Sequence, residues 1–117
     1  MADVLALVDD LFFQAKMMET ARRLGVGLKT VSNGAALLAA AALQEHKLVV
    51  VDLKARQGAL DAVAQLRAAG NAPPIIGFLS HVQTELAEQA HAAGCQEVLP
   101  RSKFTADLAE ILSRVKT

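Results

Sequence analysis

The sequence predicts an α/β fold in which helices cover both faces of a parallel sheet. Two observations predict it. Short aliphatic runs, most clearly residues 4–8 and 48–51, alternate along the chain with longer segments whose apolar residues recur at helical spacing. The runs are apolar at consecutive positions, which is typical of strands buried on both faces. No linker or low-complexity segment interrupts the alternation, so we expect one domain over residues 1–117.

The first half of the chain is expected to contain two helices and three strands, at residues 4–8, 28–31 and 48–52. After the first strand, one helical face carries the apolar residues Phe13, Met17, Ala21 and Leu24. Gly25 follows, and glycine is the residue expected just past a helix. Residues 32–34 read Ser-Asn-Gly, a turn and N-cap signal, and the alanine- and leucine-rich segment 35–43 favours a helix.

The second half is expected to contain two more strands, at residues 75–79 and 98–99, and three helices. The first helix spans about residues 59–69 and turns Leu60, Val63 and Leu66 inward. The next is marked by Val82, Leu86, Ala90 and Ala93, and Gly94 ends it. The last helix carries its apolar face on Leu108, Ile111, Leu112 and Val115.

The composition argues against several classes of protein. Twelve basic and twelve acidic residues cancel, so no basic surplus favours nucleic acid as a partner. No apolar stretch approaches membrane-spanning length, and the first residues lack the basic region of a secretory signal. The single cysteine, Cys95, rules out an internal disulfide. We therefore expect a cytoplasmic protein that contacts neither membranes nor nucleic acid.

Three aspartates follow two of the aliphatic runs. Asp9 and Asp10 close the first run, and Asp52 closes the run that begins at Leu48. If these two strands are parallel neighbours, the three carboxylates converge at the carboxyl edge of the sheet, where ligands of such sheets bind. Clustered carboxylates repel one another, and a hard divalent cation such as Mg²⁺ relieves that repulsion. The sequence therefore predicts a magnesium site, although an aspartate at a helix start also serves as an N-cap.

Taken together, these residues resemble the receiver domain of bacterial two-component response regulators, over essentially the whole chain. The resemblance is carried by Val8-Asp9-Asp10, by Asp52, by Ser80 after the fourth strand, and by Ala93-Gly94 before the fifth. It implies a flavodoxin-like (βα)5 fold with strand order 2-1-3-4-5. It also implies a phosphorelay protein that takes a phosphoryl group from a histidine kinase or phosphotransfer protein, with Mg²⁺ as cofactor. Such a protein catalyses at most its own phosphorylation and dephosphorylation.

The resemblance also implies residue roles. Asp52 would be the phospho-acceptor, and Asp9, Asp10 and Asp52 would hold Mg²⁺ together with the backbone carbonyl of Lys54. Ser80 would hydrogen-bond the phosphoryl group, although it also suits the cap of the following helix.

The basic residue of the family pattern has two candidates in the segment Leu99-Pro100-Arg101-Ser102-Lys103-Phe104. Counting forward from Gly94 selects Arg101, whereas counting back from Phe104 ends next to Lys103. We favour Arg101, because a guanidinium stays charged and can grip a phosphate with two donors. Both remain candidate site residues. The sequence is equally consistent with both being solvated surface charges that have no role in the site.

Other departures from the pattern favour an alternative function. The loop after Asp52 is short and carries Lys54 and Arg56, and Val98 stands where the family has an aromatic residue. These features fit a pseudo-receiver that binds a protein without being phosphorylated. A third option, a haloacid-dehalogenase-like phosphatase, needs Asp-x-Asp, and Asp52-Leu53-Lys54 lacks the second aspartate.

The signal of a stand-alone receiver must leave through other proteins. We expect no output domain within the 117 residues. The resemblance places the contact surface for a downstream protein on residues 82–116, and a homodimer is a further route for output.

Overall fold

A parallel sheet forms the centre of the computed structural model, which describes residues 3–54, 58–70, 73–79 and 84–116. Within these residues its five strands are ordered β2-β1-β3-β4-β5. The strands are β1 (Val4–Leu7), β2 (Leu28–Val31), β3 (Leu48–Asp52), β4 (Ile75–Leu79) and β5 (Glu97–Pro100). The predicted α/β class and the strand order 2-1-3-4-5 are both confirmed.

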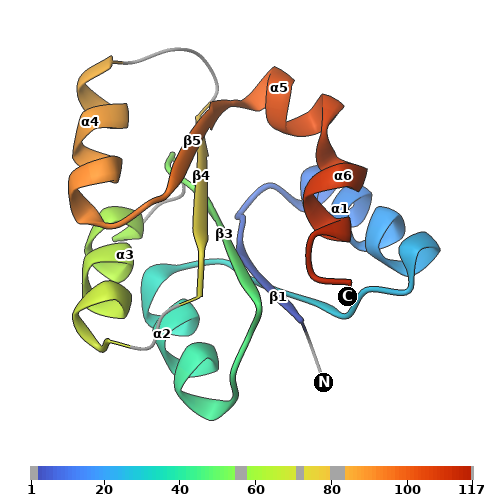
Figure 1. Cartoon of the computed structure of the whole chain (residues 1–117), viewed down its shortest axis with the longest axis horizontal. Coiled ribbons are helices and arrows are strands. Elements are labelled where there is room, and N and C mark those ends of the chain that lie inside the picture. Colours follow the sequence, from blue (N-terminus) through green and yellow to red (C-terminus); the bar gives the residue numbers. More distant parts are fainter. Residues whose placement is uncertain (1–2, 55–57, 71–72, 80–83, 117) are drawn as a thin grey trace.

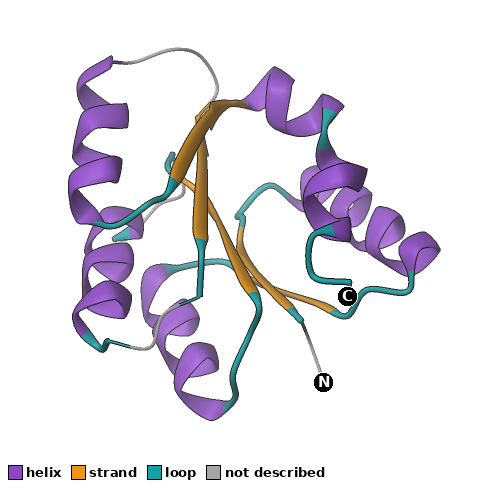
Figure 2. Cartoon of the chain, viewed as in Figure 1, coloured by secondary structure: helices purple, strands orange, loops and turns teal. Residues whose placement is uncertain are grey.

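Helices cover both faces of this sheet, as Figures 1 and 2 show. They are α1 (Leu11–Leu24), α2 (Gly34–Leu43), α3 (Ala59–Ala68), α4 (Thr84–Ala93), α5 (Arg101–Ala106) and α6 (Leu108–Ser113). One face packs against α1, α5 and α6, and the other packs against α2, α3 and α4. The sheet therefore separates two apolar cores.

The central strands explain why their sequences are apolar at every position. In β3, Leu48 and Val50 contribute to one core, whereas Val49 and Val51 contribute to the other. All five residues of β3 are buried, and so are all four of β1. Each such aliphatic side chain contributes roughly 1.5–3 kcal/mol by leaving water, so the strands cannot alternate polar and apolar residues.

The last helix differs from the prediction. We expected one helix around residues 108–115, but a separate short helix, α5, begins directly after β5 at Arg101. Phe104 explains it, because this ring is fully buried and stacks on Phe78 of β4 with ring centroids 4.6 Å apart. Phe104, Leu108 and Ile111 lie in the same core, at the i, i+4, i+7 spacing of one helical face. The turn at Asp107 divides that face into α5 and α6.

Gly25 ends α1 as predicted. Its φ of +73° lies in the left-handed region, and its N–H donates to the carbonyls of Ala21 and Arg22. A Cβ placed on Gly25 would meet no atom within 4 Å, so only the backbone conformation requires glycine.

We expect Gly25→Ala to lower the free energy of unfolding by about 1 kcal/mol, because alanine adopts a left-handed conformation reluctantly. Gly25→Asn should cost less, because asparagine tolerates this conformation better. Urea unfolding followed by circular dichroism measures both variants. Equal losses in the two variants would mean that α1 does not depend on this backbone conformation.

The structure also bears on membrane contact. In the described ranges, no helix combines the length and the apolarity needed to cross a bilayer.

Candidate functional site

The acidic residues meet at the carboxyl edge of the sheet because β1 and β3 are parallel neighbours. Leu7 pairs with Val51 across the two strands. Asp52 is therefore level with Val8, and Asp9 and Asp10 follow in the turn that leads into α1. The charges of both aspartates act on Asp52 from this same edge of the sheet.

Asp52 is the buried member of the group, with only 6% of its surface exposed. Its Oδ1 accepts a hydrogen bond from the backbone N–H of Lys54 at 2.9 Å. Burial raises the pKa of the Asp52 carboxyl; the Lys54 amide opposes this rise, and the negative charge of Asp9 adds to it. The surroundings of Asp52 in the folded chain therefore disfavour its ionised form.

The two carboxylate oxygens of Asp10 have different hydrogen-bond partners. Its Oδ1 caps α1, accepting from the backbone N–H groups of Phe12 at 2.9 Å and Phe13 at 3.3 Å. Its Oδ2 accepts from Nη2 of Arg101, also at 2.9 Å. The hydrogen bond from Arg101 is the main reason why the pKa of Asp10 is lowered, and the cap adds to it. The N-cap expected as an alternative to metal binding is therefore present.

The two basic candidates differ sharply in position. The guanidinium of Arg101 reaches Asp10 and lies over the ring of Phe13, with Cζ 4.5 Å from the ring centroid. Lys103, by contrast, pairs with Asp107 at 2.9 Å, one helical turn further along the chain. The structure thus brings Arg101 into the acidic group, and it ties Lys103 to the α5–α6 turn.

Sequence reasoning missed two residues that shape this site. The side-chain amide of Gln14 donates to the carbonyl of Val8 and so braces the turn that carries Asp9 and Asp10. Phe13 supplies the ring beneath Arg101 and packs against Phe78 and Phe104. The helical face through Phe13 predicts its burial, but no local pattern predicts the cation above its ring.

Other predicted site residues are only partly placed. Lys54 is exposed, and its backbone N–H is the group that contacts Asp52. Asp9 is exposed at the turn. Ser80 and Arg56 lie outside the described residues.

The donor chemistry of the acidic group suits a hard cation, since it consists of carboxylate oxygens. Burial raises the pKa of the Asp52 carboxyl, and a nearby cation would oppose that rise by favouring the ionised form. In the described part of the chain, however, no three His, Cys, Asp or Glu side chains are grouped as a ready ligand set. Both oxygens of Asp10 are also engaged, one by the α1 cap and the other by Arg101. A metal ion would have to share Asp10 with Arg101 or release it.

Comparison with solved structures shows what the fold resembles. The chain is similar to the chemotaxis response regulator CheY4 of Vibrio cholerae, with a TM-score of 0.84 and 22% identity over 98% of both chains. It is similar to a response regulator from Hahella chejuensis, with a TM-score of 0.85 and 22% identity over 100% of this chain and 96% of that one. The chain is also similar to the receiver domain of the sensor histidine kinase PA1611 from Pseudomonas aeruginosa, a structure with magnesium in the active site cleft. That comparison gives a TM-score of 0.82 and 24% identity over 97% of both chains.

These likenesses establish the fold. The chain has the flavodoxin-like fold found in response regulator receiver domains. No protein-family model matches the sequence, and no curated protein matches it significantly.

Proposed function

We propose that this chain is a phospho-acceptor receiver of a bacterial two-component phosphorelay. Asp52 accepts a phosphoryl group from a histidine kinase or phosphotransfer protein, with Mg²⁺ as cofactor. The observation that carries the proposal is the buried Asp52 at the carboxyl edge of the sheet, under the charges of Asp9, Asp10 and Arg101. A receiver-like fold around this one buried carboxylate is what the reaction needs.

The transfer itself asks little covalent chemistry of the protein. One carboxylate oxygen of Asp52 forms the new bond to phosphorus, and the bond between phosphorus and the donor's histidine nitrogen breaks. The imidazole leaves with the electron pair of that bond. The hydrogen bond from the Lys54 amide to Oδ1 orients the Asp52 carboxylate for in-line attack.

Charge neutralisation is the other requirement, because the transferred group carries negative charge into an acidic site. Bound by Asp9, Asp10, Asp52 and the Lys54 carbonyl, Mg²⁺ would neutralise the charge on the transferred oxygens. Arg101 supplies a second cation that can leave Asp10 for the phosphoryl group, and Ser80 is proposed to hydrogen-bond that group. Lys103 has no part in this scheme, because its partner is Asp107.

Beryllofluoride, a phosphoryl mimic, tests the proposal when it is added with Mg²⁺ and the amide NMR spectrum is followed. We expect shifts at Asp52, Leu53 and Leu79, and in the segment 84–100 if the signal reaches the proposed output surface. A spectrum unchanged around Asp52 would overturn the proposal.

The raised pKa of Asp52 predicts a pH dependence in the metal-free protein. Without Mg²⁺, the Asp52 carboxyl should take up its proton at a pH above the usual aspartate value, because burial and the charge of Asp9 disfavour the ionised form. The carboxyl carbon shift of Asp52, followed by NMR over a pH series, measures this midpoint, and added Mg²⁺ should lower it. A metal-free midpoint at or below the usual aspartate value would contradict the burial argument.

A second function is favoured by one contact. Arg101 already neutralises Asp10, so the acidic group is partly satisfied without metal or phosphate. This suits a pseudo-receiver that binds a protein partner independently of phosphorylation. Asp52→Asn discriminates, because partner binding that survives this substitution unchanged supports the pseudo-receiver, and binding that is lost from a folded variant excludes it.

A further inference from the structure

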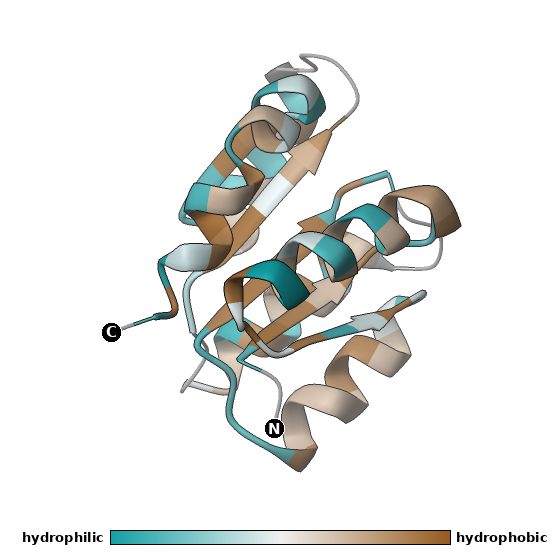
Figure 3. Cartoon of the chain, turned by 90° about the vertical axis from the view of Figure 1, so that its right-hand side faces the viewer, coloured by the Kyte–Doolittle hydropathy of each residue, from teal (hydrophilic) through white to brown (hydrophobic). Residues whose placement is uncertain are grey.

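Helix α2 is apolar on every side, which is unusual for a helix at the surface. Its ten residues, Gly34–Leu43, include no charged or hydrogen-bonding side chain. Of these, only Gly34, Leu37 and Ala40 are buried. Figure 3 shows α2 at the lower edge of the molecule in the hydrophobic colours, without the teal that marks α1. A helix that is apolar all round is normally covered on all sides, so the outer face of α2 lacks a partner in the monomer.

The uncovered face has a ridge of small residues and one large side chain. Ala35, Ala39 and Ala42 are exposed along the ridge. Leu43, at the C-terminal end of α2, is 81% exposed. Small residues allow the backbone of another helix to approach closely, and an exposed leucine leaves apolar area in water.

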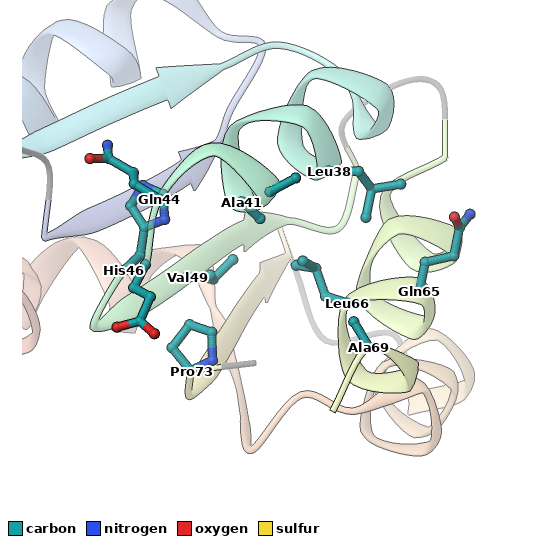
Figure 4. A pocket seen from close by; sticks show the side chains of 11 residues that line it. Leu38, Ala41, Gln44, His46, Val49, Gln65, Leu66, Ala69 and Pro73 are labelled. Atoms are coloured by element: carbon teal, nitrogen blue, oxygen red, sulfur yellow. The ribbon is translucent and has the colours of Figure 1, made fainter. Parts of the chain in front are cut away.

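A pocket of about 500 Å³ lies beside the same ridge, between α2 and α3. Figure 4 shows Leu38 and Ala41 of α2 on one side, Leu66 and Ala69 of α3 on the other, and Val49 of β3 between them. These walls are apolar, and the polar groups lie around them. Among the residues that line the pocket, Glu45 alone carries a charge at neutral pH, since burial lowers the pKa of His46.

The leucine and the pocket lie on opposite flanks of the ridge. Leu38, which lines the pocket, and Leu43 are five residues apart, so they point about 140° apart around the helix. Ala41 and Ala42, which also line the pocket, place it level with Leu43 in the C-terminal half of α2. Consider a two-fold axis that runs parallel to α2 in front of the ridge. It places a second α2 alongside the first with no shift along the helix axis, so the Leu43 of one copy faces the flank of the other copy that carries the pocket. A protrusion and a recess related in this way are what an isologous interface needs.

We propose that a second copy of this chain docks on α2, with the two helices parallel and the Leu43 of each copy in the α2–α3 pocket of the other. Charge permits this pairing, because α2 brings no charge to the interface and Glu45 lies at the exposed rim. The contact goes beyond the proposed phosphorelay function, because it uses α2 and α3 and none of the site residues at the carboxyl edge.

The size of the surface sets the strength of the contact. Ten helical residues span about 15 Å, so the ridge with its flanks buries less than the roughly 800 Å² per partner of a stable interface. We therefore expect a weak dimer, with a dissociation constant of about 0.1–1 mM.

Concentration-dependent amide NMR shifts test the proposal. We expect the shifts of the native chain to change with concentration in residues 35–46 and 65–69. Leu43→Glu should remove this dependence, whereas Leu11→Glu, which alters an equally exposed leucine of α1, should keep it. Shifts that stay constant up to about 1 mM, or that map to residues 84–100, would overturn the proposal.

Cross-linking tests the parallel arrangement. Ala35→Cys places a thiol on the ridge at the N-terminal end of α2, where a parallel pair brings the two thiols level and an antiparallel pair separates them by about 10 Å. Under mild oxidation it should form a covalent dimer faster than Ala15→Cys on the exposed side of α1. The native Cys95 is buried, so oxidation of the native chain gives the background rate of cross-linking. Equal rates for the two variants would overturn the parallel pairing. Asp52→Asn should dimerise like the native chain, so failure of the phospho-acceptor role and failure of this interface are separate results.

Discussion

Replacing Asp52 by asparagine is expected to abolish phosphorylation and, at the same time, to stabilise the fold at neutral pH. The amide is not a nucleophile toward phosphorus, so transfer from acetyl phosphate should be lost completely. The stability gain follows from burial: the ionised carboxylate is 6% exposed and is repelled by Asp9 and Asp10. The Oδ1 of asparagine can keep the hydrogen bond from the Lys54 amide. We expect the free energy of unfolding to rise by about 1 kcal/mol.

The gain should depend on pH in a definite direction. The folded-state pKa of Asp52 is raised, so the folded protein binds its proton more readily than the unfolded chain. The contribution of Asp52 to the stability of the native chain therefore becomes less unfavourable as pH falls toward the unfolded-state pKa, and the difference from Asp52→Asn should shrink there. Urea unfolding of both chains between pH 7 and pH 4 measures this. Asp9→Asn is the matched control, because Asp9 is exposed and its neutralisation should change stability much less.

A native chain that is more stable than Asp52→Asn at neutral pH would contradict this reading of the site. It would mean that the Asp52 carboxylate has a compensating cation in the folded state and is not penalised by burial.

The second large effect is expected at Arg101, where substitution should strengthen Mg²⁺ binding but weaken phosphoryl transfer. In Arg101→Met the guanidinium no longer occupies Asp10 Oδ2, and one positive charge leaves the acidic group. The attraction of the site for a divalent cation then increases, by about tenfold in affinity if the two cations lie roughly 6 Å apart at an effective dielectric close to that of water. Transfer should nevertheless slow roughly ten- to a hundredfold, because a cation that stabilises the transferred oxygens is lost.

The choice of methionine keeps an apolar stem over the Phe13 ring, so the packing beneath the charge is retained. Mg²⁺ titrations followed by the amide shifts of Leu11 and Leu53 measure the affinity, and acetyl phosphate measures the transfer. Lys103→Met is the matched control: it removes the same charge from the other basic candidate, whose partner is Asp107. If Lys103→Met changed both quantities and Arg101→Met changed neither, the assignment of Arg101 to the site would be wrong.

Much of the fold could be predicted because its signals are local. The strands at 48–52 and 75–79 have the predicted bounds, since consecutive apolar residues are what a doubly covered strand requires. The edge strand at 28–31 also has its predicted bounds, although Lys29 and Thr30 interrupt its apolar residues. Gly25 ended α1 where expected, because only glycine adopts its backbone conformation at little cost. The prediction failed at α5, because the burial of Phe104 depends on a ring from β4 that is distant in sequence.

The candidate site divides in the same way. The convergence of Asp9, Asp10 and Asp52 was predictable, since it follows from strand order alone. The two hydrogen-bonding roles of the Asp10 carboxylate were not predictable. One oxygen accepts from the backbone at the start of α1, and the other accepts from Arg101, which is 91 positions away in the sequence. Gln14 was missed for a related reason: its contact with Val8 depends on the path of the turn between them.

The sequence by itself thus determined the alternation of strands and helices, the parallel sheet and the edge at which the three aspartates meet. Hydrophobic periodicity and glycine positions are properties of short segments, and they survive any arrangement of the rest. Only the tertiary structure decided that Arg101, and not Lys103, reaches the acidic group, and that α2 keeps an apolar face uncovered. Both depend on which side chains meet across the sheet, and that is determined by the packing of distant segments.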